Sequence, residues 1–138
     1  MPTWLLIVIC ILCWGAWAVF EKQGTRHVSP LMMQIIGAYV YSAIAPIAFL
    51  YMKATGQQST WNIPGVAWTA GACGLAAIAS LAFTTAIQRA QVHLVVGFSS
   101  VYPILTFILC AIFLGEPVTW LKLVGIATIC FGVTLLTW

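Results

Sequence analysis

The chain has 138 residues, of which 63% are hydrophobic and 5% are charged, and its formal net charge is +3. A soluble domain carries about 25% charged residues, so five Lys/Arg and two Asp/Glu side chains cannot cover a water-exposed surface. A soluble globular protein is therefore excluded, and so is a nucleic-acid-binding protein, because the few basic residues are scattered along the chain. The longest polar stretch, 53–62, leaves no room for a domain outside the membrane.

Five apolar segments are long enough to cross a bilayer as helices, which takes about 20 residues each. Strands of a membrane barrel would alternate in polarity over about 10 residues, whereas these runs are continuously apolar. We therefore predict an all-α integral membrane protein with a single five-helix domain over residues 1–138. The predicted spans are 3–20, 30–52, 64–87, 94–114 and 118–138.

The first predicted span has an aromatic face. Trp14 and Trp17 follow Cys10 at helical spacing, and Glu21 continues the same side of the helix. Two tryptophans one turn apart form flat walls on which a solute can stack, so both are candidates for a substrate cavity. The alternative is packing against a neighbouring helix. Because the span can end at residue 20, we expect Glu21 and Lys22 at the membrane interface, where they would line the mouth of a cavity.

The second predicted span contains Tyr41, one heptad after Gln34, and a proline, Pro46. Polar side chains inside a membrane helix are costly and usually have a partner or a function. We therefore include Tyr41 among the cavity candidates. An internal proline removes a backbone hydrogen bond and bends the helix. We expect such a bend at Pro46, either as a purely structural feature or as part of a transport path.

The third predicted span carries a polar stripe near its end, since Ser80, Thr84 and Gln88 follow one another at intervals of four residues. Its small residues also repeat at intervals of four, a pattern that allows two helices to approach closely. Such rows serve either a dimer interface or packing within one bundle. The small residues are Ala70, Gly74, Ala72, Ala76 and Ser80.

The fourth predicted span places several hydroxyl groups around a second internal proline, Pro103, where we expect another bend. Ser99, Ser100 and Tyr102 are cavity candidates because they cluster beside this proline. The alternative is that each serine hydroxyl bonds to the backbone of its own helix. The joint before this span contributes Arg89 and His93 as further candidates for the mouth of the cavity.

The distribution of basic residues gives almost no preference for one membrane orientation. Lys53 and Lys122 fall on the side of the N-terminus, whereas Lys22, Arg26 and Arg89 fall on the other. Orientation follows the Lys/Arg asymmetry of short loops, and three against two is weak. The chain therefore inserts either in both orientations, forming an inverted pair, or in one orientation with Lys22 on the cytoplasmic side.

Catalysis and metal binding are not expected from this sequence. No carboxylate lies in the middle of a predicted span, and nothing resembles a nucleophile with a base. The five cysteines lie inside apolar runs, where cysteine usually behaves as a small buried hydrophobe. We predict no enzymatic activity, no metal and no cofactor.

The last third of the chain, "SSVYPILTFILCAIFLGEPVTWLKLVGIATICFGVTLL", resembles the end of an EamA repeat of the drug/metabolite transporter superfamily. The similarity rests on Tyr102-Pro103, the turn Leu114-Gly115-Glu116, and the spaced glycines Gly125 and Gly132. Trp14-Gly15 followed by Lys22 resembles the opening of the repeat, and "FTTAIQRAQ" resembles the end of its third helix. The resemblance therefore covers the whole chain as one repeat.

This resemblance implies a secondary carrier of small organic metabolites or drugs that works by alternating access. Most members carry two repeats in inverted orientation, so a single repeat implies an antiparallel homodimer or a heterodimer with a sister chain. The expected partners are a small-molecule solute and the lipid bilayer, without nucleic acid, in a bacterial or archaeal cell membrane. The small multidrug resistance proteins, which also pair antiparallel, carry a glutamate where this sequence has Trp14 and Trp17. The alternative function is a non-transporting membrane subunit that assembles with another membrane protein.

Overall fold

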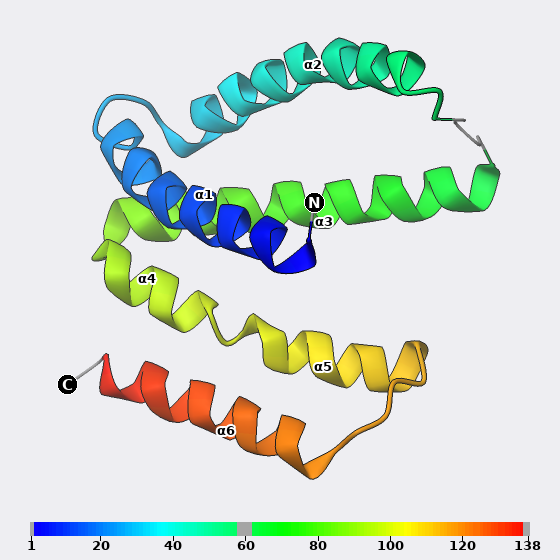
Figure 1. The fold of residues 1–138 in the computed structure, drawn as a ribbon. Coiled ribbons are helices and arrows are strands. Elements are labelled where there is room, and N and C mark those ends of the chain that lie inside the picture. Colours follow the sequence, from blue (N-terminus) through cyan, green and yellow to red (C-terminus); the bar gives the residue numbers. More distant parts are fainter. Residues whose placement is uncertain (1, 58–61, 137–138) are drawn as a thin grey trace. The chain divides into compact units, whose positions relative to one another are not determined.

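The computed structural model describes residues 2–57 and 62–136, and the described part of the chain is helical (Figure 1). Six helices follow one another within these described residues. They are α1 (Thr3–Gly24), α2 (Pro30–Ala54), α3 (Ile63–Arg89), α4 (Val92–Ser99), α5 (Tyr102–Phe113) and α6 (Trp120–Leu135).

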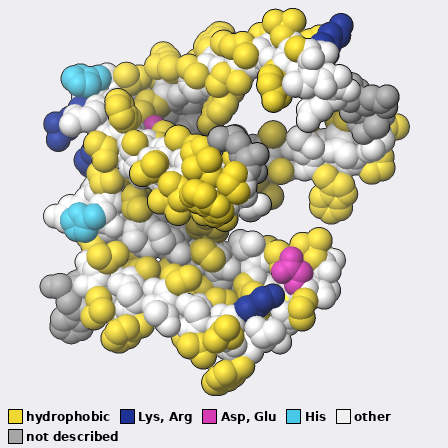
Figure 2. Space-filling view, in the orientation of Figure 1, with side chains coloured by type: hydrophobic (Ala, Val, Ile, Leu, Met, Phe, Trp, Pro, Cys, Tyr) yellow, Lys and Arg dark blue, Asp and Glu magenta, His cyan; other side chains and the backbone are white. Residues whose placement is uncertain are grey.

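The predicted all-α membrane architecture is confirmed. Four apolar helical stretches within the described residues are long enough to cross a membrane, namely α1, α2, α3 and the combined stretch Val92–Phe113. Hydrophobic side chains cover much of the visible face, and charged side chains are few (Figure 2). Such a surface is stable only against lipid or another apolar surface.

The final helix is shorter than the predicted span 118–138. It has 16 residues, because the chain stays non-helical from 115 to 119 and α6 begins only at Trp120. Pro117 lies in this non-helical run and cannot donate a backbone hydrogen bond to a helix. The last two residues of the predicted span, 137–138, lie outside the described residues.

The chain divides into two compact units, Met1–Arg89 and Ala90–Trp138. In the first unit, α3 contacts both α1 and α2. Two residues of α3, Thr84 and Ile87, have no exposed surface. The centre of the first unit therefore lies along the second half of α3.

Local capping explains where several helices begin. The Ser29 side chain accepts a hydrogen bond from the backbone nitrogen of Met32, and Pro30 occupies the first position of α2, where a missing N–H costs nothing. Thr119 caps α6 in the same way. Polar capping residues at the ends of apolar runs thus mark the starts of α2 and α6.

The first helix continues four residues beyond the predicted end of its span, to Gly24. Glu21 and Lys22 are therefore helical and half-buried, rather than part of a hydrated joint. The extension is explained by α3, which supplies a hydrogen-bonding partner to each of these two side chains.

In the second unit, the fourth predicted span is divided into α4 and α5. The helix is interrupted at Ser100 and Val101, where the Val101 nitrogen bonds to the carbonyl three residues earlier. Pro103, at the second position of α5, has no N–H with which to continue the helical ladder across the break. Gly97 is buried one turn before the break, where a side chain would collide with Leu136 at 2.6 Å.

Candidate functional site

The aromatic face of α1 meets α3 at Trp17. The indole ring of Trp17 stacks on the ring of Phe83, with centroids 5.1 Å apart and an interplanar angle of 18°. Stacked aromatic rings contribute packing beyond their buried area. One of the two predicted cavity tryptophans is therefore in contact with a neighbouring helix of its own unit.

One turn further along α1, the carboxylate of Glu21 contacts the hydroxyl of Thr84 on α3. The same hydroxyl lies 2.8 Å from the backbone carbonyl oxygen of Ser80, one turn earlier on α3. The side-chain hydroxyl of Ser80 in turn accepts a hydrogen bond from Nε2 of Gln34 on α2, at 2.9 Å. Glu21, Thr84, Ser80 and Gln34 thus form a polar cluster that joins the three helices of the first unit.

Lys22 makes a different contact with the same helix. Its Nζ donates a hydrogen bond to the backbone carbonyl oxygen of Ile87, in the last turn of α3. The final carbonyls of a helix have no partner within the helix and carry partial negative charge. A lysine ammonium at this position therefore stabilises the end of α3. Glu21 and Lys22, which are adjacent on α1, thus contact α3 at two different places.

Three of the predicted cavity residues are largely exposed aromatic side chains. Trp14 on α1 is 65% exposed, Tyr41 on α2 is 76% exposed, and Tyr102 on α5 is 61% exposed. Trp17, by comparison, is 39% exposed because Phe83 covers part of it. No hydrogen bond or ring stacking joins these aromatic residues to one another in the described part of either unit.

The two predicted cavity serines bond to their own helix. The hydroxyls of Ser99 and Ser100 both donate to the backbone carbonyl oxygen of Val96, at 2.9 and 2.8 Å. Both residues remain exposed at the break between α4 and α5. Pro103 lies just after this break, whereas Pro46 lies inside α2, which continues as one helix to Ala54.

The remaining candidates for the mouth of the cavity are the last residue of α3 in the first unit and an early residue of α4 in the second. Arg89 is the last residue of α3 and is exposed. His93 is the second residue of α4 and is also exposed. A basic residue at the end of a helix interacts favourably with the helix dipole, which accounts for the position of Arg89 without a solute.

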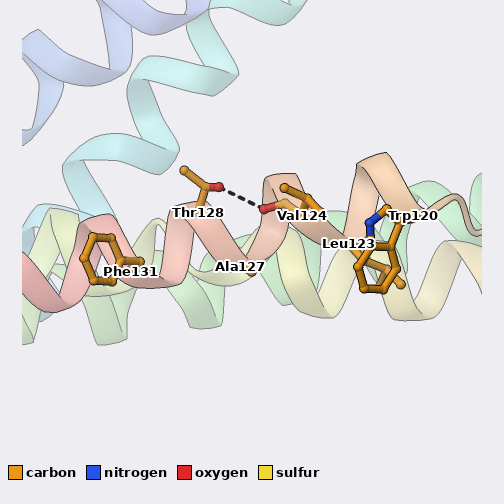
Figure 3. A pocket seen from close by; sticks show the side chains of 6 residues that line it. All are labelled: Trp120, Leu123, Val124, Ala127, Thr128 and Phe131. Carbon is orange, nitrogen blue, oxygen red and sulfur yellow. Dashed lines mark hydrogen bonds between the residues drawn. The ribbon is translucent and has the colours of Figure 1, made fainter.

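A shallow groove of about 540 Å³ lies in the second unit (Figure 3). Every lining residue comes from one face of α6, so the groove is the outer surface of a helix and not an enclosed chamber. Its one hydroxyl, that of Thr128, donates to the carbonyl oxygen of Val124 at 2.9 Å. None of the predicted cavity residues lines it. The lining residues are Trp120, Leu123, Val124, Ala127, Thr128 and Phe131.

Four residues whose side chains take part in the stack and the polar cluster were absent from the predicted site: Phe83, Thr84, Ser80 and Gln34. A signal for Ser80 and Thr84 was present in the sequence, because both belong to the polar stripe of the third span. The spacing identified the stripe but not its partners, since Gln88, the third member, is exposed. The partners depend on how α1 and α2 pack on α3, which spacing within one helix does not reveal.

The apolar helices and their mutual polar contacts define an integral membrane protein of the α-helical class. The sequence model of the EamA-like transporter family matches residues 1–138. The chain therefore belongs to the EamA-like transporter family, as its resemblance to an EamA repeat indicated.

One curated relative is an uncharacterized transporter of Archaeoglobus fulgidus. It is 26% identical over 141 residues, which cover 99% of this chain and 48% of the relative. The chain thus spans about half the length of the curated relative that it matches. No solved structure was found to match the chain.

Proposed function

We propose that the chain is a secondary transporter of small organic metabolites or drugs, working by alternating access as a dimer of five-helix repeats. The observation that carries this proposal is the match to a transporter family over the whole chain. The archaeal relative, itself described as a transporter, is about twice as long as the matched segment. A second copy of this chain, or a sister chain, would supply a second segment of similar length.

The exposed aromatic residues support a solute path between two such copies. Tyr41 lies near the middle of α2 and is 76% exposed. A tyrosine hydroxyl at the centre of a bilayer lacks the water or polar partner that it needs. In a dimer, Tyr41, Trp14 and Tyr102 would line a shared cavity that provides such partners, together with Ser99 and Ser100.

The charges favour an anionic or zwitterionic solute. Lys22 and Arg89 both lie on the membrane side where α1 ends and α3 ends. Basic groups at a cavity mouth raise the local concentration of anionic substrates. Amino-acid-like metabolites fit this electrostatic pattern and also the aromatic walls, and the cell membrane of a bacterium or archaeon is the proposed location.

Uptake by proteoliposomes tests the proposal, with a panel of amino acids, organic acids and organic cations. For any solute taken up, Trp14→Ala should reduce uptake at least tenfold, because it removes one wall of the cavity. Trp4→Ala is the matched control, since Trp4 lies on the same helix and is also 65% exposed.

Equal uptake by the two variants would remove Trp14 from the cavity. A wild-type chain that moves no member of the panel, yet copurifies with a different membrane protein, would favour the alternative function as a non-transporting subunit.

A further inference from the structure

The break between α4 and α5 leaves two backbone carbonyl oxygens without a hydrogen bond. In a continuous helix the carbonyl of Ser99 would accept from the nitrogen of residue 103, but Pro103 has no N–H. The carbonyl of Ser100 would accept from Ile104, whose N–H bonds instead to the carbonyl of Val101 at 3.0 Å. No other donor among the described residues bonds to either oxygen. Both serines are exposed, so a partner for these carbonyls has to come from outside α4 and α5.

The two serine side chains at the break add further acceptors. Each hydroxyl has a single proton, and both protons are donated to the backbone carbonyl of Val96. What Ser99 and Ser100 still offer is therefore the lone pairs of their hydroxyl oxygens. The last carbonyls of a helix also carry partial negative charge. Donors at the break belong to α5, whose first N–H groups have no partner in their own helix, so the α4 side of the break presents acceptors.

This break falls close to the centre of an apolar stretch that is long enough to cross a membrane. The stretch Val92–Phe113 has 22 residues, and the interruption lies at Ser100 and Val101. Hydrocarbon offers no water to an unpaired carbonyl, and non-helical backbone at this depth is tolerated only against protein or a water-filled cavity. The exposed carbonyls of the break therefore face a polar space and not lipid.

We propose that the α4–α5 break is a binding site for a small monovalent cation, held by the carbonyl and hydroxyl oxygens of Ser99 and Ser100. Backbone carbonyl oxygens can replace the hydration shell of a monovalent ion. Divalent cations prefer carboxylates, and residues 92–113 contain none. The ring of Tyr102, at the start of α5, is 61% exposed, and aromatic faces attract cations.

Two sources share this chemistry: a sodium ion, and a primary ammonium group on an organic solute. An ammonium group donates three hydrogen bonds, which suits a group of acceptors, and it is the occupant that we expect. This choice rests on the proposed transport of amino-acid-like solutes, whereas the cation site itself does not. A quaternary ammonium ion such as choline has the same charge but no N–H to donate, and it serves as the control cation.

The sequence allows each of the two carbonyls to be observed separately. Ser99–Ser100 is the one Ser–Ser pair in the chain, and Ser100–Val101 is the one Ser–Val pair. A chain with ¹³C at its serine carbonyls and ¹⁵N in serine and valine therefore gives one carbonyl–nitrogen NMR correlation for each site. The full chain in lipid nanodiscs would be titrated with methylammonium chloride, or with sodium chloride, in exchange for choline chloride at constant ionic strength.

An internal reference comes from α2. The carbonyl of Ser42 also precedes a proline by four residues, Pro46, but it lies within a continuous helix without a second free carbonyl beside it. Adding ¹⁵N-alanine makes it visible through the pair Ser42–Ala43, which occurs once. We expect the correlations of Ser99 and Ser100 to shift and saturate with methylammonium while that of Ser42 stays in place.

The matched variants are two proline substitutions. Pro103→Ala supplies the N–H that the carbonyl of Ser99 lacks, so it should abolish the methylammonium-dependent shift of Ser99. Pro46→Ala makes the same change in another apolar helix and should leave that shift intact. A response to sodium without a response to methylammonium would keep the cation site and overturn its assignment to an ammonium group.

Three results would overturn the cation site itself. One is a linear drift, or no shift, of the Ser99 and Ser100 correlations with both cations. Another is an equal shift at Ser42, which would indicate a general effect of the salt. The last is a shift of Ser99 that is the same in wild type and Pro103→Ala. Binding is measured without movement of a solute, so the cation site and the proposed transport fail separately.

Discussion

Trp17 of α1 and Phe83 of α3 stack with their ring planes only 18° apart. Trp14 lies on the same side of α1 as Trp17. Because only Trp17 makes this contact, the two tryptophans have different surroundings. Trp17 is partly covered within its own unit, whereas Trp14 is 65% exposed. Trp17 therefore contributes to holding α1 on α3, and Trp14 is the tryptophan with a free surface for a solute or a second copy.

A double-mutant cycle measures the Trp17–Phe83 contact. We expect Trp17→Ala and Phe83→Ala to show a coupling free energy of about 0.5–1.5 kcal/mol, because removing either ring already removes the stack. The free energy of unfolding would be measured by detergent titration in mixed micelles, followed by circular dichroism. Trp14→Ala combined with Phe83→Ala is the control and should be additive within error. Additivity in the Trp17–Phe83 cycle itself would contradict the stacking.

Hydropathy alone predicted the helical membrane class and the approximate position of each span, because a bilayer demands long, continuous apolar helices. It failed at boundaries that depend on other helices. The first helix runs to Gly24 because α3 provides partners for Glu21 and Lys22. The start of α6 at Trp120 was also missed. Hydropathy is the same for an apolar residue in a helix and in an extended segment, so it could not show that the chain around Pro117 is non-helical.

The site was less predictable than the fold. Spacing on α3 singled out Ser80 and Thr84, but it could not distinguish them from the exposed Gln88. Glu21 and Lys22 are adjacent and were assigned together to the interface, yet one contacts a side chain and the other a backbone carbonyl. These contacts depend on the rotation of α1 about its axis relative to α3, which a single-helix pattern does not contain.

Lys22 stabilises the C-terminal end of α3. We expect Lys22→Met to lower the free energy of unfolding by about 1.5–3 kcal/mol, the usual contribution of a hydrogen bond to a charged group. The variant keeps the length of the side chain and removes only its donor. Lys53→Met is the control, because Lys53 is exposed at the end of α2, 5.2 Å from the ring of Phe49. Equal effects of the two variants would show that the bond to Ile87 contributes nothing.

Gly97 permits a close approach between α4 and Leu136, the residue that follows α6. A Cβ at this position would lie 2.6 Å from Leu136 Cδ1, whereas a Cβ at Gly125 on α6 would meet nothing within 4 Å. Gly97→Ala should therefore be less stable than Gly125→Ala by at most about 1 kcal/mol, the low end of the usual cost of overpacking, because Leu136 Cδ1 is the tip of an exposed, flexible side chain that can move aside. Thermal unfolding of both variants in detergent checks this. If Leu136→Ala restores the stability of Gly97→Ala, the collision with Leu136 causes the loss of stability. Failure of this rescue would refute the collision as the cause.

The proposed antiparallel homodimer requires the chain to insert in both orientations, which the nearly balanced distribution of basic residues permits. His27 follows α1 and Gln57 follows α2, so they lie beyond opposite ends of α2 and are expected on opposite membrane sides, and both are exposed. With a membrane-impermeant maleimide on intact cells, both His27→Cys and Gln57→Cys should be labelled, each in about half of the molecules because opposite insertion is nearly equal in free energy.

The parent chain is the control for this labelling, because its five native cysteines lie in α1, α3, α5 and α6. Lipid should keep the reagent from them, so the parent should remain unlabelled. Adding two lysines beside His27 should then bias insertion and reduce labelling at that site, since basic loops are retained on the cytoplasmic side. Labelling of only one of the two reporter sites in the unmodified background would exclude an antiparallel homodimer and leave a sister chain as the source of the second repeat.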